Sequence, residues 1–467
     1  MCPSGKCRDS GNHAASFLLV LTAALLCIGS LPTEAQRSEP PSVRTAPATT
    51  DAARSSSSSN SSAAPPFAVF GYLPEYRQLR FDYEAFFRSG LTHLIFFSAE
   101  VDPTSLQLTH VDDRLPSREK WKTLRELADT YGVKLLLCIG GGGRSAGFPR
   151  LVGDVLGRRR FVSEVGRVLH ERDLDGVDFN WEYPSSMPEW LNFGQFLTEL
   201  RSALNRTTAG DHHGRRVGPA LITMALHPHP RIPHVLRVSH VLPSLDYLHW
   251  MAYDHIIAND SHSSVAYAAS VLQDDVIGDL DDAVYNARLK KIRRQAHGEA
   301  EEDAPQSRKP HEADHRRKLC LGIPFYGRHR ADGRVPPETY EHLWQFLRQW
   351  AGKRHPDWVE GGPELRSLSE YAGYDYNGYD DVRRKMRLAR SSGIAGIMIW
   401  ELGQDVPPGT SPMSLMTAVQ EQLAEWDKDT ASNADESDAC LRTPARLEHT
   451  RENATRLVGS DDADEDL

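Results

Sequence analysis

Eight short apolar segments recur along the chain, and amphipathic or helix-forming stretches separate them. The apolar segments have the length and composition of buried strands, whereas the stretches between them repeat apolar residues at helical spacing. Eight strands alternating with helices predict a closed (β/α)8 TIM barrel, an α/β fold whose chemistry lies at the carboxyl ends of the strands. An open, doubly wound sheet shows the same alternation and is the alternative. We expect strands at 67–73, 91–98, 133–140, 174–182, 220–226, 245–253, 318–324 and 394–400, and helices at 117–131, 158–172, 190–204, 267–288 and 380–391.

Changes in composition mark the limits of this barrel. Residues 1–35 have the charged start, apolar run and small-residue end of a secretory signal peptide. A Ser-, Pro- and Ala-rich linker at 36–66 and an acidic tail at 427–467 cannot form a core, and we expect both to be disordered. The barrel should therefore occupy 67–426, interrupted by a disordered, highly charged insertion at 286–317.

The predicted compartment and partners follow from the same features. A signal peptide predicts secretion, no stable membrane anchor is expected, and a net charge of -10 argues against nucleic acid as a partner. Only three cysteines remain after the signal, too few for a disulfide framework, and two of them lie in apolar runs as predicted buried thiols. These are Cys138 and Cys320, with Cys440 in the tail, and the glycosylation sequons begin at Asn60, Asn205, Asn259 and Asn453.

The fourth expected strand carries three polar residues in alternation. Asp178, Asn180 and Glu182 project to one side of this strand, and the residues between them are apolar or aromatic. Acids on a strand most often lie on a solvated edge, but the wholly apolar opposite face favours a strand held inside the protein. Burial and mutual repulsion should then raise the pKa of one carboxyl, which suits a general acid.

At these residues the chain resembles the chitinases of glycoside hydrolase family 18, whose signature is a loose Asp-Gly-x-Asp-x-Asp-x-Glu, often followed by Tyr-Pro. The matching residues are Asp175, Gly176, Asp178, Glu182, Tyr183 and Pro184. Asn180 stands where the family carries its last aspartate. The resemblance extends over most of 67–426 and implies the same barrel fold, with an insertion after the seventh strand at 327–376 that is short for the family and helical at 337–350.

Further site residues follow from the resemblance. Cys138, before Gly140 and Gly141, replaces the serine of the family's Ser-x-Gly-Gly, and the glycine run could alternatively be a phosphate loop, although it lacks that motif's lysine. Met251, Tyr253 and Asp254 are similar to the family's Met-x-Tyr-Asp, in which the tyrosine would bind the acetamido group and the aspartate a sugar hydroxyl. Tyr253 could also be a simple core ring. Trp400 would form the floor of the sugar site, and Tyr72 would help to hold the acid cluster.

The resemblance also implies a mechanism, in which Glu182 protonates the glycosidic oxygen and the substrate's N-acetyl group supplies the nucleophile. Asn180 could accept a hydrogen bond from the acetamido N–H and donate its amide to Asp178, but it lacks the aspartate's negative charge. Losing that charge would cost roughly a hundredfold or more in rate. The change at Cys138 could be coupled to the change at Asn180.

Three functions are compatible with these residues. The first is a secreted, retaining chitinase-like enzyme acting on β-1,4-linked N-acetylglucosamine. The others are a chitin-binding lectin with weak or no hydrolysis because of Asn180, and a glycosidase for other N-acetylglucosamine polymers. No metal or organic cofactor is expected, because His227 and His229 lack an obvious set of further ligands.

Overall fold

The computed structural model describes residues 66–207, 219–255, 261–297, 313–331 and 335–441. The expected signal peptide, almost all of the linker and the sequons at Asn60, Asn259 and Asn453 lie outside these residues. Among the described residues, no helix has both the length and the apolar character needed to cross a bilayer.

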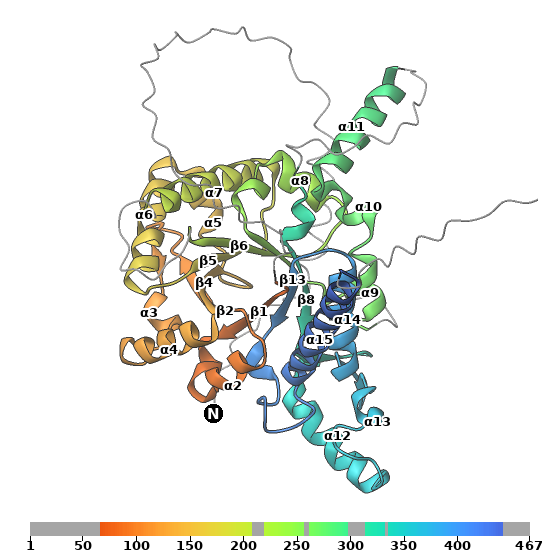
Figure 1. Ribbon diagram of the computed structural model, residues 1–467. Helices are drawn as coiled ribbons and strands as arrows, with labels where there is room; N and C mark the ends of the chain where they lie inside the picture. Colours follow the sequence, from red (N-terminus) through yellow and green to blue (C-terminus); the bar gives the residue numbers. More distant parts are fainter. Residues whose placement is uncertain (1–65, 208–218, 256–260, 298–312, 332–334, 442–467) are drawn as a thin grey trace, which may run out of the picture. The chain divides into compact units, whose positions relative to one another are not determined.

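Eight parallel strands close into a barrel (Figure 1). Closure is shown by β1, which pairs in parallel with β2 on one side and with β13 on the other. The predicted TIM barrel is therefore confirmed, and an open sheet is excluded. A short strand, β3 (Leu108–Thr109), adds to β2 in the antiparallel sense. The barrel strands are β1 (Ala68–Pro74), β2 (His93–Val101), β4 (Lys134–Gly140), β5 (Gly176–Asn180), β6 (Leu221–Leu226), β7 (Tyr247–Trp250), β8 (Leu319–Pro324) and β13 (Gly396–Trp400).

Capping residues mark the start and end of helices between the strands. At α4 (Arg118–Tyr131), the Ser117 hydroxyl accepts the Lys120 N–H at the start and Gly132 adopts a left-handed conformation at the end. The other helices around the barrel are α2 (Tyr83–Arg88), α3 (Val111–Arg114), α5 (Phe148–Gly153), α6 (Val155–Glu171), α7 (Met187–Thr207), α8 (Ile232–Val238) and α14 (Tyr379–Ser391). A last helix, α15 (Leu415–Leu441), follows in the chain.

The expected helix at 267–288 is wrong in its extent. The structure divides it into α9 (Val265–Ser270), α10 (Asp274–Ile277) and α11 (Asp282–His297). The Asp281 carboxylate accepts the Ala283 N–H at 2.9 Å and so caps the start of α11. A separate helix therefore begins inside the range expected to be one helix.

Two segments expected to be disordered are partly helical. Helix α11 continues through residues 286–297 of the charged insertion, and α15 continues through 427–441 of the tail. Neither stretch contains proline or glycine, so charged residues with good helix propensity can extend an existing helix there. Residues 298–312 and 442–467 lie outside the described part of the chain.

The insertion after β8 is a small α+β element. Its four strands form a sheet in the order β10-β9-β12-β11, and its main helix confirms the helical middle expected from the sequence. The members are β9 (Tyr326–His329), β10 (Glu338–Thr339), α12 (Tyr340–Arg354), α13 (Pro363–Arg366), β11 (Glu370–Tyr371) and β12 (Tyr374–Asp375).

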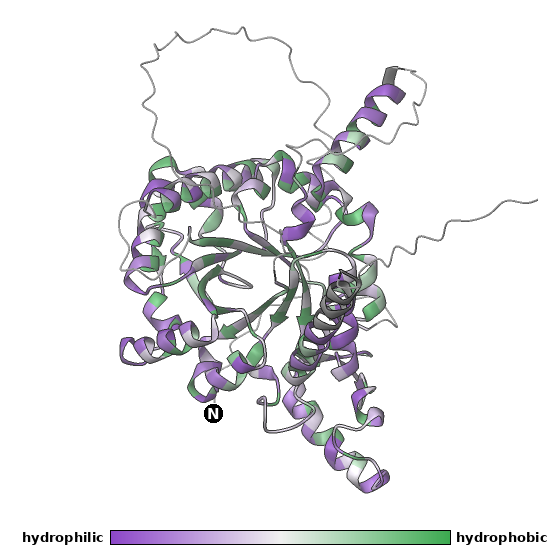
Figure 2. Cartoon of the chain, in the orientation of Figure 1, coloured by the Kyte–Doolittle hydropathy of each residue, from purple (hydrophilic) through white to green (hydrophobic). Residues whose placement is uncertain are grey.

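The inside of the barrel is a packed core. Inward-facing side chains from successive strands form one buried cluster that includes Phe70, Ile95, Cys138, Cys320 and Met398. Cys138 and Cys320 are the buried free thiols that the sequence predicts. Figure 2 shows the strands as mainly hydrophobic and the surrounding helices as mixed. Polar residues on the inner face of a strand are therefore exceptional, and they mark the candidate site.

Candidate active site

Asp178 lies on β5 and points into the barrel, where it is fully buried. Its carboxylate accepts hydrogen bonds from the Tyr72 hydroxyl at 2.8 Å and from the Thr223 hydroxyl at 2.5 Å. The Cys138 thiol, its direct neighbour on β4, is a further donor. Burial raises the pKa of Asp178, and the three neutral donors oppose this rise only in part.

Asn180 follows on the same inner face of β5, and its amide bonds differently from the prediction. Its Nδ2 donates to Glu182 Oε1 at 3.0 Å, whereas the sequence led us to expect donation to Asp178. The physical reason is that Tyr72, Thr223 and Cys138 already supply donors to Asp178. Asn180 Oδ1 is buried and has no hydrogen-bond partner among the described residues. It is a free acceptor next to the glutamate.

Glu182 comes two residues after the end of β5, and the loop after β4 supports it. Its backbone N–H donates to the Ser145 hydroxyl at 3.1 Å, and the Gly142 N–H donates to its carboxylate. Burial raises the pKa of Glu182, the donors from Asn180 and Gly142 oppose the rise, and the charge of Asp254 adds to it. The expected rise in pKa is therefore present, but burial causes most of it and repulsion between neighbouring acids contributes little.

Asp254 lies beyond the end of β7, in a left-handed conformation with φ of 60°. Its Oδ1 accepts hydrogen bonds from the Tyr326 hydroxyl at 2.6 Å and from Arg328 Nε at 2.5 Å, both on β9. Burial acts against its charged form, but the hydrogen bonds from His262, Arg328 and Tyr326 hold the pKa of Asp254 well below its usual range. This carboxylate is ionised.

Aromatic side chains complete the mouth of the barrel. Tyr72, Cys138, Met251 and Tyr253 belong to the buried core cluster, and Trp400 packs against it. The Trp400 ring lies 4.6 Å from that of Phe97 and 5.5 Å from that of Tyr72, measured between centroids. Tyr253 is buried, and its hydroxyl lies 4.0 Å from the sulfur of Met398. The predicted site residues thus lie on the barrel strands or directly after them, with Glu182, Asp254 and Trp400 at or beyond the carboxyl ends.

Sequence reasoning missed several partners of these residues. Thr223 lies opposite Asp178 in the β5–β6 register, so strand alternation could have indicated it. Ser145 comes from the loop after β4, where periodicity gives no signal, and Arg328 lies on the short strand β9 of the insertion, outside the repeating barrel pattern.

The other possible sites do not compete with this one. His227 lies near the rings of Tyr183 and Tyr253, and no group of three or more potential ligands in the described part of the chain could hold a metal ion. A cavity of about 870 Å³ lies between α6 and α7 on the outside of the barrel, and none of the site residues lines it.

Comparison with known proteins identifies the family of this chain. The sequence profile of "Glycosyl hydrolases family 18" matches residues 68–405. The chain belongs to this family. It is 25% identical over 367 residues to the class V chitinase of Arabidopsis thaliana, covering 74% of this chain and 86% of that protein. It is also 25% identical over 361 residues to Nod factor hydrolase protein 1 of Medicago truncatula, covering 71% of this chain and 84% of that protein.

Solved structures show the same fold. A family 18 chitinase from Cycas revoluta, in complex with (GlcNAc)3, superposes with a TM-score of 0.52 and 20% identity, covering 77% of this chain and 99% of that one. At this distance the likeness concerns the fold, and the family 18 barrel is the frame in which the site residues are held.

Proposed function

We propose that this chitinase-like protein hydrolyses β-1,4 bonds beside N-acetylglucosamine, with chitin or its oligomers as substrate. The observation that carries the proposal is the Glu182 carboxyl, whose pKa burial raises and which Asn180 and Gly142 orient at the barrel mouth. A carboxyl with a raised pKa keeps its proton to a higher pH and can donate it to a leaving oxygen. Further support comes from the names of the relatives and from the N-acetylglucosamine oligosaccharide in the Cycas complex.

In the proposed first step, Glu182 gives its proton to the glycosidic oxygen as the bond to the anomeric carbon breaks. The carbonyl oxygen of the substrate's N-acetyl group attacks that carbon, which gives a cyclic oxazolinium ion. Glu182, now ionised, then takes a proton from the water that opens the ring. Two inversions at the anomeric carbon leave its configuration retained, and the protein supplies no nucleophile.

Asn180 has a divided role in this scheme. Its Nδ2 holds the Glu182 carboxyl, while its unpartnered Oδ1 is available to the acetamido N–H of the substrate. The neutral amide can orient the nucleophile but adds no charge opposite the oxazolinium ion. Asp178, which lies on the same face of β5, is the residue proposed to supply such a charge from that strand.

The remaining site residues are proposed to bind sugar. Trp400 would stack under the ring that carries the nucleophile, Tyr253 would hydrogen-bond the acetamido group, and the ionised Asp254 would accept from a sugar hydroxyl. Tyr72, Cys138 and Met251 line the site from the core side. The signal peptide expected at 1–35 leads us to propose entry to the secretory pathway.

The proposal is tested by incubating the purified protein with chitin tetramer and hexamer and resolving the product anomers by proton NMR at early times. Retention predicts β-anomers first. Glu182→Gln should lower kcat by roughly 10²–10⁴-fold because it removes the transferable proton, while oligosaccharide binding persists.

Glu171→Gln on the exposed face of α6 is the matched control and should act as wild type. A kcat in Glu182→Gln close to that of the wild type would contradict the assignment of the acid. Binding without turnover in the wild type would make the protein a lectin.

A further inference from the structure

The loop between β4 and α5, residues 140–147, is built on glycine. Gly140, Gly141 and Gly143 have φ values of 99°, 107° and 77°, in the region that other residues avoid. A Cβ on Gly141 would lie 2.3 Å from Cζ of Phe97, so the backbone also needs this close approach. Glycine-rich segments lose much conformational entropy on ordering, and such a loop keeps one geometry only where other groups fasten it.

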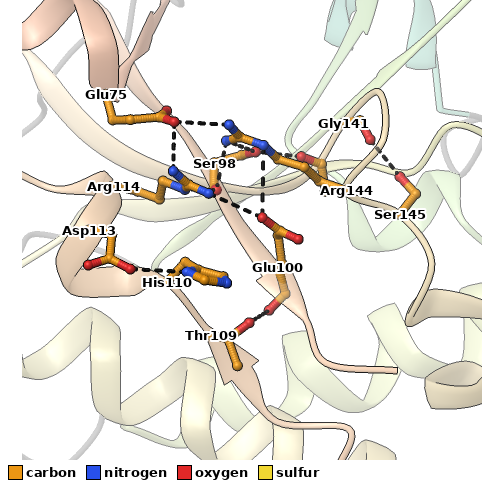
Figure 3. A network of polar contacts seen from close by, with 11 residues as sticks. Glu75, Ser98, Glu100, Thr109, His110, Asp113, Arg114, Gly141, Arg144 and Ser145 are labelled. Carbon is orange, nitrogen blue, oxygen red and sulfur yellow. Dashed lines mark hydrogen bonds and ion pairs between the residues drawn. The ribbon is translucent and has the colours of Figure 1, made fainter. Parts of the chain in front are cut away.

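Arg144 fastens the outer side of the loop (Figure 3). Its Nη1 donates to the Ser98 carbonyl at 3.2 Å and lies 3.3 Å from the Ser98 hydroxyl, and its Nη2 donates to Glu75 at 2.9 Å. The guanidinium also lies over the Phe97 ring at 5.4 Å. Glu75 is shared with Arg114 at 2.6 Å. The loop is thereby tied to the ends of β1 and β2.

Ser145 fastens the inner side of the loop to the catalytic strand. Its hydroxyl accepts the Glu182 N–H at 3.1 Å and donates to the Gly141 carbonyl at 3.0 Å, with the Asn180 carbonyl at 3.3 Å as a second acceptor. The same loop returns a hydrogen bond, because the Gly142 N–H donates to the Glu182 carboxylate. The loop therefore holds both the backbone and the acid group of Glu182.

We propose that Ser145, with Arg144 behind it, is a positioning residue that sets the geometry of Glu182 through the glycine loop. The inference rests on the proposed function, since it gives Glu182 the catalytic role. The proposal also accounts for the glycine run. In a phosphate loop the backbone N–H groups bind a ligand, whereas here the Gly142 N–H donates to the Glu182 carboxylate of the protein itself.

The proposal has a consequence for titration. Without the Ser145 hydroxyl the loop relaxes and the Gly142 N–H withdraws, so the pKa of Glu182 should rise, because that donor favours the ionised form. The other titratable groups facing Glu182 are Cys138, Tyr183, Tyr253 and Asp254. Burial raises the pKa of the first three, which stay neutral, and Asp254 stays charged. None of them changes state in the window where Glu182 titrates.

The test is a carbon-13 NMR titration of the Glu182 carboxyl, assigned with Glu182→Gln, in wild type, Ser145→Ala, Ser145→Thr and Arg144→Met. We expect a higher pKa in Ser145→Ala and Arg144→Met and the wild-type value in Ser145→Thr, which keeps a hydroxyl. The matched control is Ser163→Ala. It removes an exposed hydroxyl on α6 that donates to the Arg159 carbonyl.

Kinetics on chitin hexamer supply the second readout. Ser145→Ala should lower kcat roughly ten- to a hundredfold by misplacing the acid, with KM changed less than about twofold, and should move the alkaline limb of the pH profile upward. An unchanged Glu182 titration in Ser145→Ala overturns the inference, as does a fall in kcat that Ser145→Thr does not restore. The expected shift in titration in a protein without turnover upholds the positioning role and refutes the proposed function.

Discussion

Asp178 and Asp254 belong to the same candidate site, and their surroundings shift their pKa values in opposite directions. Asp178 is fully buried and meets hydroxyl and thiol donors that are all neutral, so its pKa is raised. Asp254 is only partly buried, and Arg328 donates to it, so its pKa falls well below the usual range. Neutral donors reduce the cost of burying a carboxylate, whereas a guanidinium outweighs it.

The difference assigns the two residues different work. Asp254 is ionised throughout the physiological range and can accept from a substrate hydroxyl without changing state. The pKa of Asp178 is set by two opposing effects, since burial raises it and hydrogen bonds from three neutral donors lower it. The charge of Asp178 is therefore sensitive to changes in those donors. Asn180 is neutral, so Asp178 is the carboxylate on the inner face of β5 that can oppose a developing positive charge.

Asp178→Asn should lower activity more than the other changes around these two aspartates. It removes that negative charge, and we expect kcat on chitin hexamer to fall roughly 10²–10³-fold, as when other electrostatic stabilisers are removed. The measurement is steady-state kinetics beside Asp113→Asn, an exposed control on α3. A loss of less than about tenfold would mean that the charge of Asp178 does not stabilise the transition state.

The same variant has a predicted effect on stability. The folded-state pKa of Asp178 lies above its unfolded value of about 3.9, so the free energy of unfolding falls as pH rises from that value through the raised pKa. Asp178→Asn should lack this decline. Thermal unfolding followed across pH would show it.

Asn180→Asp should have the next largest effect, because it places a third carboxyl between those of Asp178 and Glu182 in the chain. If missing charge limits the rate, kcat should rise by about tenfold or more. The new carboxyl would face Glu182 Oε1, now 3.0 Å from the amide, so the alkaline limb of the pH profile should move upward as repulsion raises the pKa of Glu182. An unchanged or lower kcat at the new optimum would refute a limiting role for the missing charge.

Cys138→Ser combined with Asn180→Asp tests whether the two departures from the family pattern are coupled. The Cys138 thiol donates to Asp178, whereas the Asn180 amide donates to Glu182. Effects on log kcat that simply add would show that the two changes are independent.

Arg328→Met, which changes the surroundings of Asp254, should have the smallest effect. Removing the guanidinium raises the pKa of Asp254 and should destabilise the fold by about 1 kcal/mol at pH 7, since the pair is partly exposed. A depressed pKa stabilises the fold above the unfolded value of about 3.9, so the difference from wild type should shrink as pH falls below it. Thermal unfolding across pH, beside Arg167→Met on α6, measures this, and a pH-independent difference would contradict it.

The sequence predicted the structure correctly where the prediction depends on the periodicity of apolar residues. Apolar segments and their spacing predicted every barrel strand, and alternation along 174–182 placed Asp178 and Asn180 on the inner face. It failed where the decisive contact is local capping or a partner distant in the chain. The Asp281 cap that splits the helix at 267–288, the extension of α11 into the charged insertion, and the donors Thr223, Ser145 and Arg328 are examples.

The barrel, its family and the strand that carries the acids can therefore be inferred from the residue pattern, because side-chain alternation is fixed by the backbone. The donor that each carboxyl meets depends instead on contacts between distant parts of the folded chain. Tyr72 and Asp178 are 106 residues apart and Arg328 and Asp254 are 74 apart, so closure of the barrel and folding of the insertion bring them together. The Asn180 amide could serve either acid, and it turned to Glu182 because neutral donors from β1, β4 and β6 already surround Asp178.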